Sequence, residues 1–459
     1  MIPGPRSRRL AARLRRVESR NITYLSENFP VFWESANGCR ILDADGNSFL
    51  DLTGAFAVSS LGHSSKAVRA AIETQARKMW HGMGDVHPSR VKVEFLEALC
   101  KFLPGKPNVC IPSCSGSDAV ESAVKTARLK TGRAGILVFE GAYHGLSYGT
   151  LPLTDRQESS GPFSDQLGRF VFRAPYPDSL RGPDPEACLK AAQEIFKRHR
   201  IGAILVEPMQ GRGGMRIPRV DFLKGLEALA GKNDALLIFD EIFTGFGRTG
   251  RWFAWEHAGI EPDLMAVGKA MSNGFPISAC VGRRDVMNAW PPSDGEAIHT
   301  GTFLGNPLGC AMGLASLREM KRLDLARRSA ALGGEWKADL VRVLGGLPFV
   351  GEIRGSGLFI GIEIVKGRKA LEPDAKRAAA IVSEALHQKL IILSCGKGRN
   401  VIGLTPPLTI KRQELEEATN ILIDVFVRRS PAVRGPTRRS QPCKTPGIAT
   451  VAGQQATSQ

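Results

Sequence analysis

The chain has 459 residues, of which 43% are hydrophobic, so it is long enough for two or three domains and a large core. Its net charge of +17 is high, but residues 1–20 and 428–459 each contribute +6, which leaves about +5 for the rest. We therefore expect a nearly balanced folded body with two solvated basic arms, and the charge alone does not indicate nucleic-acid binding.

Nine cysteines are spread along the chain without a C-x-x-C spacing or a paired His/Cys set. This pattern argues against a zinc site and favours reduced thiols in a cytoplasmic protein. No apolar run approaches the roughly 18 residues that span a bilayer, and no apolar segment of a secretory signal follows the N-terminal arginines. We expect no metal and no membrane partner; an organelle transit peptide is disfavoured because the N-terminal segment has little serine.

The first elements expected in chain order are short. Residues 10–20 are consistent with an amphipathic helix. Residues 40–52 predict a β-hairpin that turns at Asp45-Gly46. Residues 66–80 have apolar side chains at helical spacing.

From about residue 110, apolar runs of strand length alternate with helical patterns. We expect strands at 134–140, 203–207, 235–241, 264–268 and 278–282, and helices at 117–130, 186–199, 219–230 and 307–321. Alternation of this kind predicts an α/β fold with a mostly parallel sheet covered on both faces.

The C-terminal third predicts a smaller α+β domain. A helical stretch follows Lys321, and then come a strand at 357–365, a helix at 374–389, a strand at 390–394 and a helix at 412–427. We expect the hairpin at 40–52 to join this domain. The predicted divisions are a basic arm (1–20), a segment joining the small domain (21–60), a large domain (61–325), the small domain (326–428) and a disordered basic tail (429–459).

Lys269 stands directly after the strand-like run 264–268 and before a Gly/Pro loop. An amine at a sheet edge can form a Schiff base if burial lowers its pKa, although a single lysine there is more often solvated. Asp240 ends the apolar run 235–239 in the same way. A lysine and an acid at two strand ends suit pyridoxal phosphate (PLP), because the lysine binds its aldehyde and the acid pairs with its pyridinium nitrogen.

Three further positions fit this cofactor. Gly116 and Ser117 open a helical stripe, where backbone N–H groups can hold a phosphate, although an ordinary helix cap has the same sequence. Tyr143 is placed to stack on a planar ring, although a surface aromatic is the alternative. Ile242, beside Asp240, is placed to pack on the other face of the ring.

Taken together and in order, these motifs resemble the class III (omega-type) PLP-dependent aminotransferases of fold type I. The series covers roughly residues 25–428 and comprises Ser115-Gly-Ser-Asp-Ala, Tyr143-His-Gly, Glu207-Pro-Met-Gln-Gly, Asp240-Glu-Ile, Gly245-Phe-Gly-Arg-Thr-Gly250, Lys269, Thr302-Phe-Leu-Gly-Asn-Pro307 and Pro406-Pro-Leu. Each motif is weak alone, but their order and spacing are specific. The resemblance implies a large domain with a mostly parallel seven-stranded sheet and a smaller α+β domain.

The resemblance also implies roles for residues at matching positions. They are the Schiff-base lysine and proton carrier (Lys269), its pyridinium partner (Asp240), the phosphate loop (Gly116 and Ser117), the two residues on the ring faces (Tyr143 and Ile242) and a threonine that reaches the neighbouring subunit's phosphate (Thr302). A homodimer with shared active sites is therefore expected. The role of Glu207 is left open.

The implied activity is transfer of an amino group from an amino acid or omega-amino compound to a 2-oxo acid by a ping-pong mechanism. A racemase or epimerase on the same scaffold is the alternative, because some relatives of the family invert Cα instead. A hypothesis of another class is a binding protein that uses the basic arms on an anionic partner.

Four positions depart from the family pattern. Arg212 replaces the second acid of E-P-x-Q-G-E-G-G, and Gly403 replaces the arginine that binds the substrate carboxylate before Pro-Pro-Leu. Leu146 replaces the arginine of many 4-aminobutyrate enzymes, and Phe243 replaces a frequent glutamine. We hypothesise that Arg212 binds the substrate carboxylate from the opposite wall; the alternative is that it points to solvent. The amino donor stays open.

Overall fold

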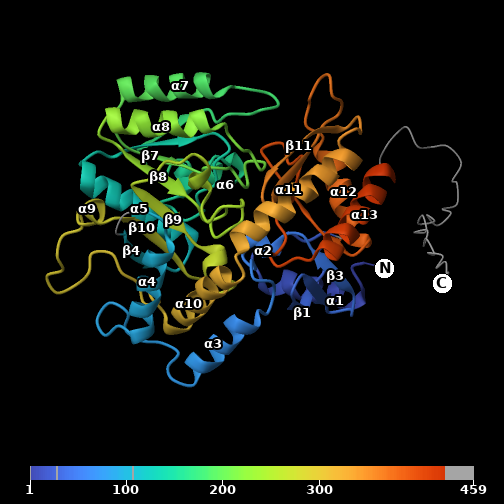
Figure 1. Ribbon diagram of the computed structural model, residues 1–459, viewed down its shortest axis with the longest axis horizontal. Helices are drawn as coiled ribbons and strands as arrows, with labels where there is room; N and C mark the ends of the chain where they lie inside the picture. Colours follow the sequence, from blue (N-terminus) through green and yellow to red (C-terminus); the bar gives the residue numbers. More distant parts are fainter. Residues whose placement is uncertain (1, 27–28, 106–107, 429–459) are drawn as a thin grey trace, which may run out of the picture.

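The computed structural model describes residues 2–26, 29–105 and 108–428 (Figure 1). The predicted disordered tail at 429–459 lies outside this range. Figure 1 shows one group of elements around a large sheet and a second, smaller group to which both ends of the described chain belong. Within the described ranges, every helix is too short or too polar to cross a bilayer.

The large sheet has seven strands in the order β4-β10-β9-β8-β7-β5-β6. Their bounds are β4 (Asn108–Ser113), β5 (Gly135–Phe139), β6 (Val171–Ala174), β7 (Ile201–Val206), β8 (Leu236–Asp240), β9 (Leu264–Val267) and β10 (Ser278–Arg283). Neighbours from β9 to β6 pair in parallel, whereas β10 is antiparallel to both β9 and β4. The mostly parallel seven-stranded sheet predicted from the sequence is confirmed.

Helices cover both faces of this sheet because its strands carry apolar side chains on both faces. Ile238 of β8 belongs to the same core cluster as Val120 of α5, whereas Phe239 belongs to another cluster, together with Phe222 of α8. The helices of this part are α3 (Lys66–Ala76), α4 (Arg90–Phe102), α5 (Gly116–Thr131), α6 (Gln157–Ser160), α7 (Pro185–Arg198), α8 (Val220–Lys232), α9 (Arg284–Met287) and α10 (Pro307–Arg322).

The smaller group contains two four-stranded sheets. The first has the order β11-β12-β15-β14, formed by β11 (Val350–Ser356), β12 (Phe359–Ile364), β14 (Leu393–Cys395) and β15 (Val401–Leu404). Its helices are α11 (Leu325–Leu344), α12 (Ala375–His387) and α13 (Arg412–Arg428). A strand and helix content of this kind agrees with the expected smaller α+β part.

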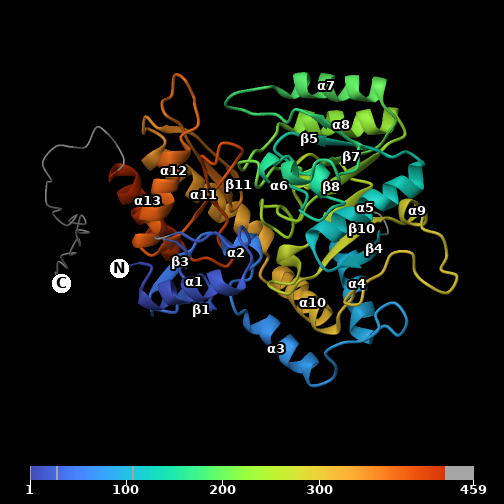
Figure 2. The same cartoon turned by 180° about the vertical axis from the view of Figure 1, so that it is seen from behind.

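The second small sheet joins the two ends of the chain. It has the order β1-β2-β3-β13, with β1 (Trp33–Asn37), β2 (Arg40–Asp43), β3 (Ser48–Asp51) and β13 (Leu390–Ile391), and α2 (Gly54–Ala57) follows β3. The hairpin predicted at 40–52 is present, and its strand β3 pairs in parallel with β13. Figures 1 and 2 both place this N-terminal segment beside α12 and α13. The domain boundaries themselves stay predictions.

The N-terminal helix differs from the expectation of residues 10–20. It is α1 (Pro5–Val17), and the carboxylate of Asp45 accepts hydrogen bonds from the N–H groups of Arg6 at 2.7 Å and Ser7 at 2.9 Å. The cap comes from the hairpin turn, so it is invisible in the local sequence. The arginines of this arm are exposed, but the helix is attached to the folded body.

Other differences concern elements that were not predicted. They are the strands β1, β4, β6, β11 and β15 and the helices α2, α4, α6 and α9. The strand β4 is an edge strand and contains Pro112, which weakens its strand signal. The helix expected at 66–80 ends at Ala76. The strand expected at 390–394 divides into β13 and β14, which belong to different sheets.

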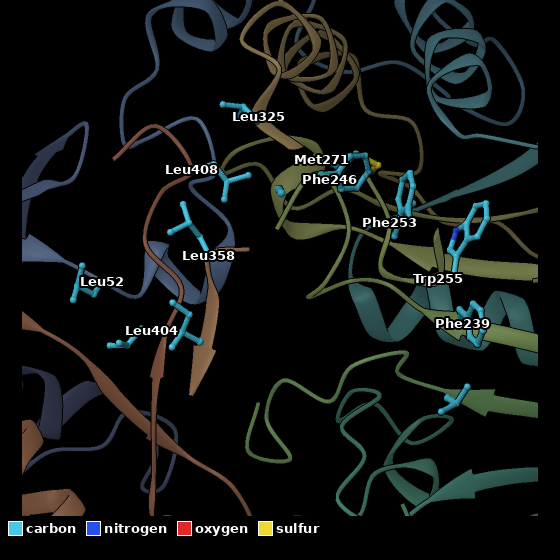
Figure 3. Packing of buried hydrophobic residues seen from close by; sticks show 14 of the residues in the cluster. Leu52, Phe239, Phe246, Phe253, Trp255, Met271, Leu325, Leu358, Leu404 and Leu408 are labelled. Carbon is cyan, nitrogen blue, oxygen red and sulfur yellow. The ribbon is translucent and has the colours of Figure 1, made fainter. Parts of the chain in front are cut away.

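One hydrophobic core connects the large sheet to the small sheets. Figure 3 shows Phe239, Phe246 and Phe253 on one side, and Leu358 and Leu404 on the other, within a single cluster of buried side chains. Close packing of this kind leaves few voids and has low compressibility. The two parts of the chain therefore share one continuous core.

Candidate active site

Lys269 lies at the carboxyl edge of the large sheet, where β9 gives way to a short 3-10 helix (Lys269–Met271). Its backbone has φ +46°, a conformation that a residue with a side chain adopts rarely and that is retained where the surroundings enforce it. Its Nζ lies 4.4 Å from the centroid of the Phe243 ring. Burial lowers the pKa of the Lys269 amine to about 8, against the opposing effect of Asp240. A fraction of the amine is therefore neutral and nucleophilic at neutral pH.

Asp240 ends β8, the strand beside β9, and pairs in register with Ala266. This register brings the carboxylate to the sheet edge that carries Lys269. The carboxylate is 4% exposed; its Oδ2 accepts a hydrogen bond from His144 Nδ1 at 2.8 Å, and its Oδ1 accepts one from the Ile242 N–H at 3.1 Å. The two bonds fix the orientation of the carboxylate.

His144 is a residue that the sequence analysis did not assign. It is buried, and its N–H donates to Thr154 Oγ1 at 2.9 Å. The signal in the sequence was its place in Tyr143-His-Gly, but its contact with Asp240 joins residues 96 positions apart and depends on the fold.

Glu207, whose role was left open, ties two loops together. It follows β7, and its carboxylate accepts the N–H of Tyr143 at 2.9 Å and the N–H of Gly211 at 3.0 Å. Burial raises the pKa of Glu207 to about 7, although His144 opposes the shift. The residue therefore positions Tyr143 relative to the loop that carries Arg212.

The start of α5 lies against the same edge of the sheet. Ser115 caps the helix by accepting the Asp118 N–H at 3.2 Å, and the first N–H groups of a helix, here those of Gly116 and Ser117, have no partner within it. A Cβ on Gly116 would lie 2.7 Å from Ile242 Cδ1. Glycine is therefore what allows the helix start to approach Ile242.

A second close approach joins Ser117 to the loop after Tyr143. The Leu146 N–H donates to Ser117 Oγ at 3.3 Å. Gly145 has φ +117°, and a Cβ at this position would collide with Ser117 Oγ. The structure thus brings Gly116, Ser117 and Ile242 to the edge that carries Asp240 and Lys269.

Arg212 lies in the loop after β7 and is half-buried. Its Cζ is 5.8 Å from the centroid of the Tyr143 ring, and its charge contributes to the lowered pKa of Lys269. Arg156, which the sequence analysis did not single out, lies at the same 5.8 Å from this ring. The arrangement places two guanidinium groups beside Tyr143.

Met215 fills the space in front of Gly403, where the family pattern has arginine. A Cβ on Gly403 would lie 2.7 Å from Met215 Cε, and a Cβ on Gly361 would lie 2.7 Å from Met215 Cβ. The buried Met215 therefore occupies the wall from which a family arginine would extend.

Thr302 stands apart from the other predicted site residues. It is exposed, and the residues beside it contact the segment 81–85: Thr300 donates to Asp85 at 2.7 Å, and the rings of His81 and Phe303 lie 5.4 Å apart. Exposed apolar side chains lie in this segment and in the residues 80–86 that contact it, and they are Trp80, Met83, Val86, Ile298 and Phe303.

A buried amine, a fixed carboxylate and an open helix start at one sheet edge form a donor set that fits PLP: an amine for its aldehyde, an anion for its ring nitrogen and N–H groups for its phosphate. This fold and this donor set define a PLP-dependent enzyme of fold type I. The pattern of the family Aminotransferase class-III matches residues 23–426. The chain belongs to the class III aminotransferases, and its cofactor is PLP.

Known proteins similar to the chain agree with this membership. A 5-aminovalerate aminotransferase of Pseudomonas aeruginosa is 37% identical over 86% of this chain and 93% of its own length. A 4-aminobutyrate aminotransferase of Escherichia coli is 36% identical over 86% of this chain and 93% of its own. The structure of an ornithine aminotransferase from Toxoplasma gondii, which has PLP at partial occupancy in its active site, is similar with a TM-score of 0.80 and 28% identity over 91% of this chain and 94% of its own.

Proposed function

We propose that the chain transfers an amino group from an omega-amino acid to a 2-oxo acid, in two half-reactions, at the site around Lys269. The observation that carries the proposal is the lowered pKa of the Lys269 amine beside Asp240 on the neighbouring strand. The substrate class is taken from relatives that act on 5-aminovalerate and 4-aminobutyrate.

PLP, when bound, supplies the electron-withdrawing ring that makes loss of a proton from the substrate carbon feasible. We propose that Lys269 Nζ holds the cofactor between turnovers and, once released by the substrate amine, moves that proton. Asp240 provides the anion for the ring nitrogen, and His144 keeps the carboxylate aligned. The N–H groups of Gly116 and Ser117 bind the phosphate.

Tyr143 and Ile242 are proposed to enclose the cofactor ring from its two faces. Their placement supports this role. The backbone N–H of Tyr143 donates to the Glu207 carboxylate, and the backbone N–H of Ile242 donates to the Asp240 carboxylate. Each is anchored through its backbone N–H, so its side chain is free to pack on a ring.

Arg212 is proposed to bind a substrate carboxylate in place of the family arginine, because Gly403 occupies the position of that arginine in this chain. A guanidinium group 5.8 Å from the centroid of the Tyr143 ring supports this role, because Met215 fills the space in front of Gly403. Arg212→Ala should raise KM for amino and oxo acids far more than KM for simple amines. Equal effects on both substrate classes would contradict the proposal.

We propose a homodimer in which Thr302 reaches the partner's site. The exposed apolar set around Thr302 supports a covered surface, because contiguous apolar patches on monomers are usually small.

The test mixes Lys269→Ala and Thr302→Ala chains after dissociation. One intact site then forms in each mixed dimer, so about a quarter of the wild-type sites should return by random pairing. Activity that stays at the sum of the two parents would contradict shared sites.

The central experiment combines chemistry with a substrate screen. Borohydride reduction of the PLP-loaded protein should fix the cofactor to Lys269, as identified by peptide mass, and the cofactor spectrum should change with an omega-amino acid and return with a 2-oxo acid. Label at another residue would contradict the assigned site. Loss of optical rotation in an amino acid without any 2-oxo acid would favour inversion at Cα instead.

We also propose a cytoplasmic location and the division into a large domain (61–325) and a small domain (326–428) with its N-terminal segment (21–60). The eight cysteines of the described residues are free thiols, which supports the location, and the pairing of β3 with β13 supports the division into domains. Cell fractionation and limited proteolysis test them.

A further inference from the structure

Two arginines from distant segments meet beside Tyr143. Arg156 precedes α6 and Arg212 follows β7, yet each guanidinium carbon lies 5.8 Å from the centroid of the Tyr143 ring. Nη2 of Arg156 donates to the carbonyl oxygen of Arg212 at 3.2 Å. The two cations are therefore neighbours on one wall of the site.

This arrangement concentrates positive charge where little protein charge offsets it. Burial and the charge of Arg212 lower the pKa of Arg156. The side chain of Arg156 is 18% exposed, and its carboxylate neighbour is Glu158 at 3.6 Å, which is 52% exposed and also 3.6 Å from Arg399. An ion pair so exposed is weak. Within the described part of the chain, no carboxylate lies within 4.0 Å of the Arg212 guanidinium.

The backbone under Arg212 is held firmly. The Gly396 N–H donates to the Arg212 carbonyl at 3.0 Å, and Nε of Arg354 donates to the carbonyls of Gly214 at 3.1 Å and Met215 at 3.0 Å. Arg354 is in turn paired with Glu363 at 2.6 Å. The backbone of Arg212 is thus set before any ligand arrives, which reduces the loop ordering that binding has to overcome.

We infer that Arg156 and Arg212 form one anion site that binds a single substrate carboxylate between the two guanidinium groups. The inference rests on the proposed function and adds Arg156 as a second residue that determines specificity. Two guanidinium groups offer several planar N–H donors to two carboxylate oxygens, and a bound anion removes the repulsion between them. The ligand class is a linear amino acid or oxo acid, as opposed to an amine without a carboxylate.

The test measures binding without turnover. Valerate, a five-carbon carboxylate that has no amine, is titrated by calorimetry into the PLP-loaded wild type and into Arg156→Gln, Arg212→Gln and the double variant. We expect each single change to raise Kd by about tenfold or more, since each removes charge-assisted hydrogen bonds. The double change should raise Kd by less than the product of the two, because both groups bind the same carboxylate.

Arg399→Gln is the matched control, since it also removes a guanidinium group beside Glu158 and should leave the Kd for valerate within about twofold of wild type. Arg156→Lys, which keeps the charge, should recover part of the affinity. In the first half-reaction alone, followed by cofactor absorbance without any 2-oxo acid, Arg156→Gln should slow the reaction of an omega-amino acid far more than that of pentylamine, which lacks a carboxylate. This comparison separates the two causes of a loss: a displaced loop would slow the reaction of both substrates, whereas a lost carboxylate site would slow only that of the omega-amino acid.

Three outcomes would overturn the inference: an unchanged Kd for valerate in Arg156→Gln, an equal loss of rate in the half-reactions of pentylamine and the omega-amino acid in that variant, or no valerate binding to the wild type. Failure of the proposed function is distinct from these, because it would appear as valerate binding by the wild type without any amino transfer.

Discussion

The pKa of Lys269 leads to a quantitative prediction for the cofactor-free protein. Burial lowers this pKa from 10.5 to about 8, and it is the neutral amine that attacks an aldehyde. At pH 7 a pKa of 8 leaves about 9% of the amine neutral, whereas 10.5 leaves about 0.03%, a difference of about 300-fold. The fold thus makes Lys269 far more reactive than an exposed lysine.

The sign of the pH dependence follows directly. Because the pKa is lowered, the neutral form grows as pH rises through about 8 and is nearly complete by about 9. The rate of covalent PLP capture, followed by absorbance after stopped-flow mixing between pH 6.5 and 10, should rise and then level off near pH 9. Arg212→Ala should move the midpoint upward because Arg212 helps to lower the pKa of Lys269, and Arg399→Gln should leave it in place. A rate that keeps rising tenfold per pH unit up to pH 10 would refute the reasoning.

Further predictions concern the charge, packing and capping described above. Asp240→Asn should lower kcat at least about 100-fold with little change in Tm, because an anion near the ring nitrogen contributes about 4 kcal/mol at 4 Å. His144→Ala should lower kcat less than Asp240→Asn does, and it should shift the cofactor spectrum. Gly403→Arg should destabilise the fold by about 1–3 kcal/mol through contact with Met215, and Met215→Ala in the same chain should relieve part of it, as measured by urea unfolding. Asp45→Ala should lower the free energy of unfolding by about 1–2 kcal/mol, since it removes the cap of α1; no change in the urea midpoint would argue that α1 contributes nothing.

The catalytic edge of the sheet was predictable because its signals are local. Asp240 and Lys269 each end a continuous apolar run, and parallel strands bring such ends together. The buried strands β7 and β8 and the helix α8 between them were found for the same reason. These elements carry their pattern in consecutive residues.

Residues that act through distant contacts left no comparable signal. His144 meets Asp240, and Arg156 meets Arg212, only after the sheet has formed. The start of α1 depends on Asp45 from another segment. For Thr302, the expected contact lies on another subunit, so one chain cannot display it.

The pairing of β3 with β13 bears on how the molecule is made. Leu50 pairs with Leu390, a partner that leaves the ribosome 340 residues later. Closing a loop of that length costs about 3 kcal/mol more than closing one of ten residues, so this junction is expected to form late. Until then β3 is an open strand edge, which is prone to wrong pairing. Chains that stop before residue 390 are therefore expected to aggregate during synthesis, even with every cofactor-contacting residue in place.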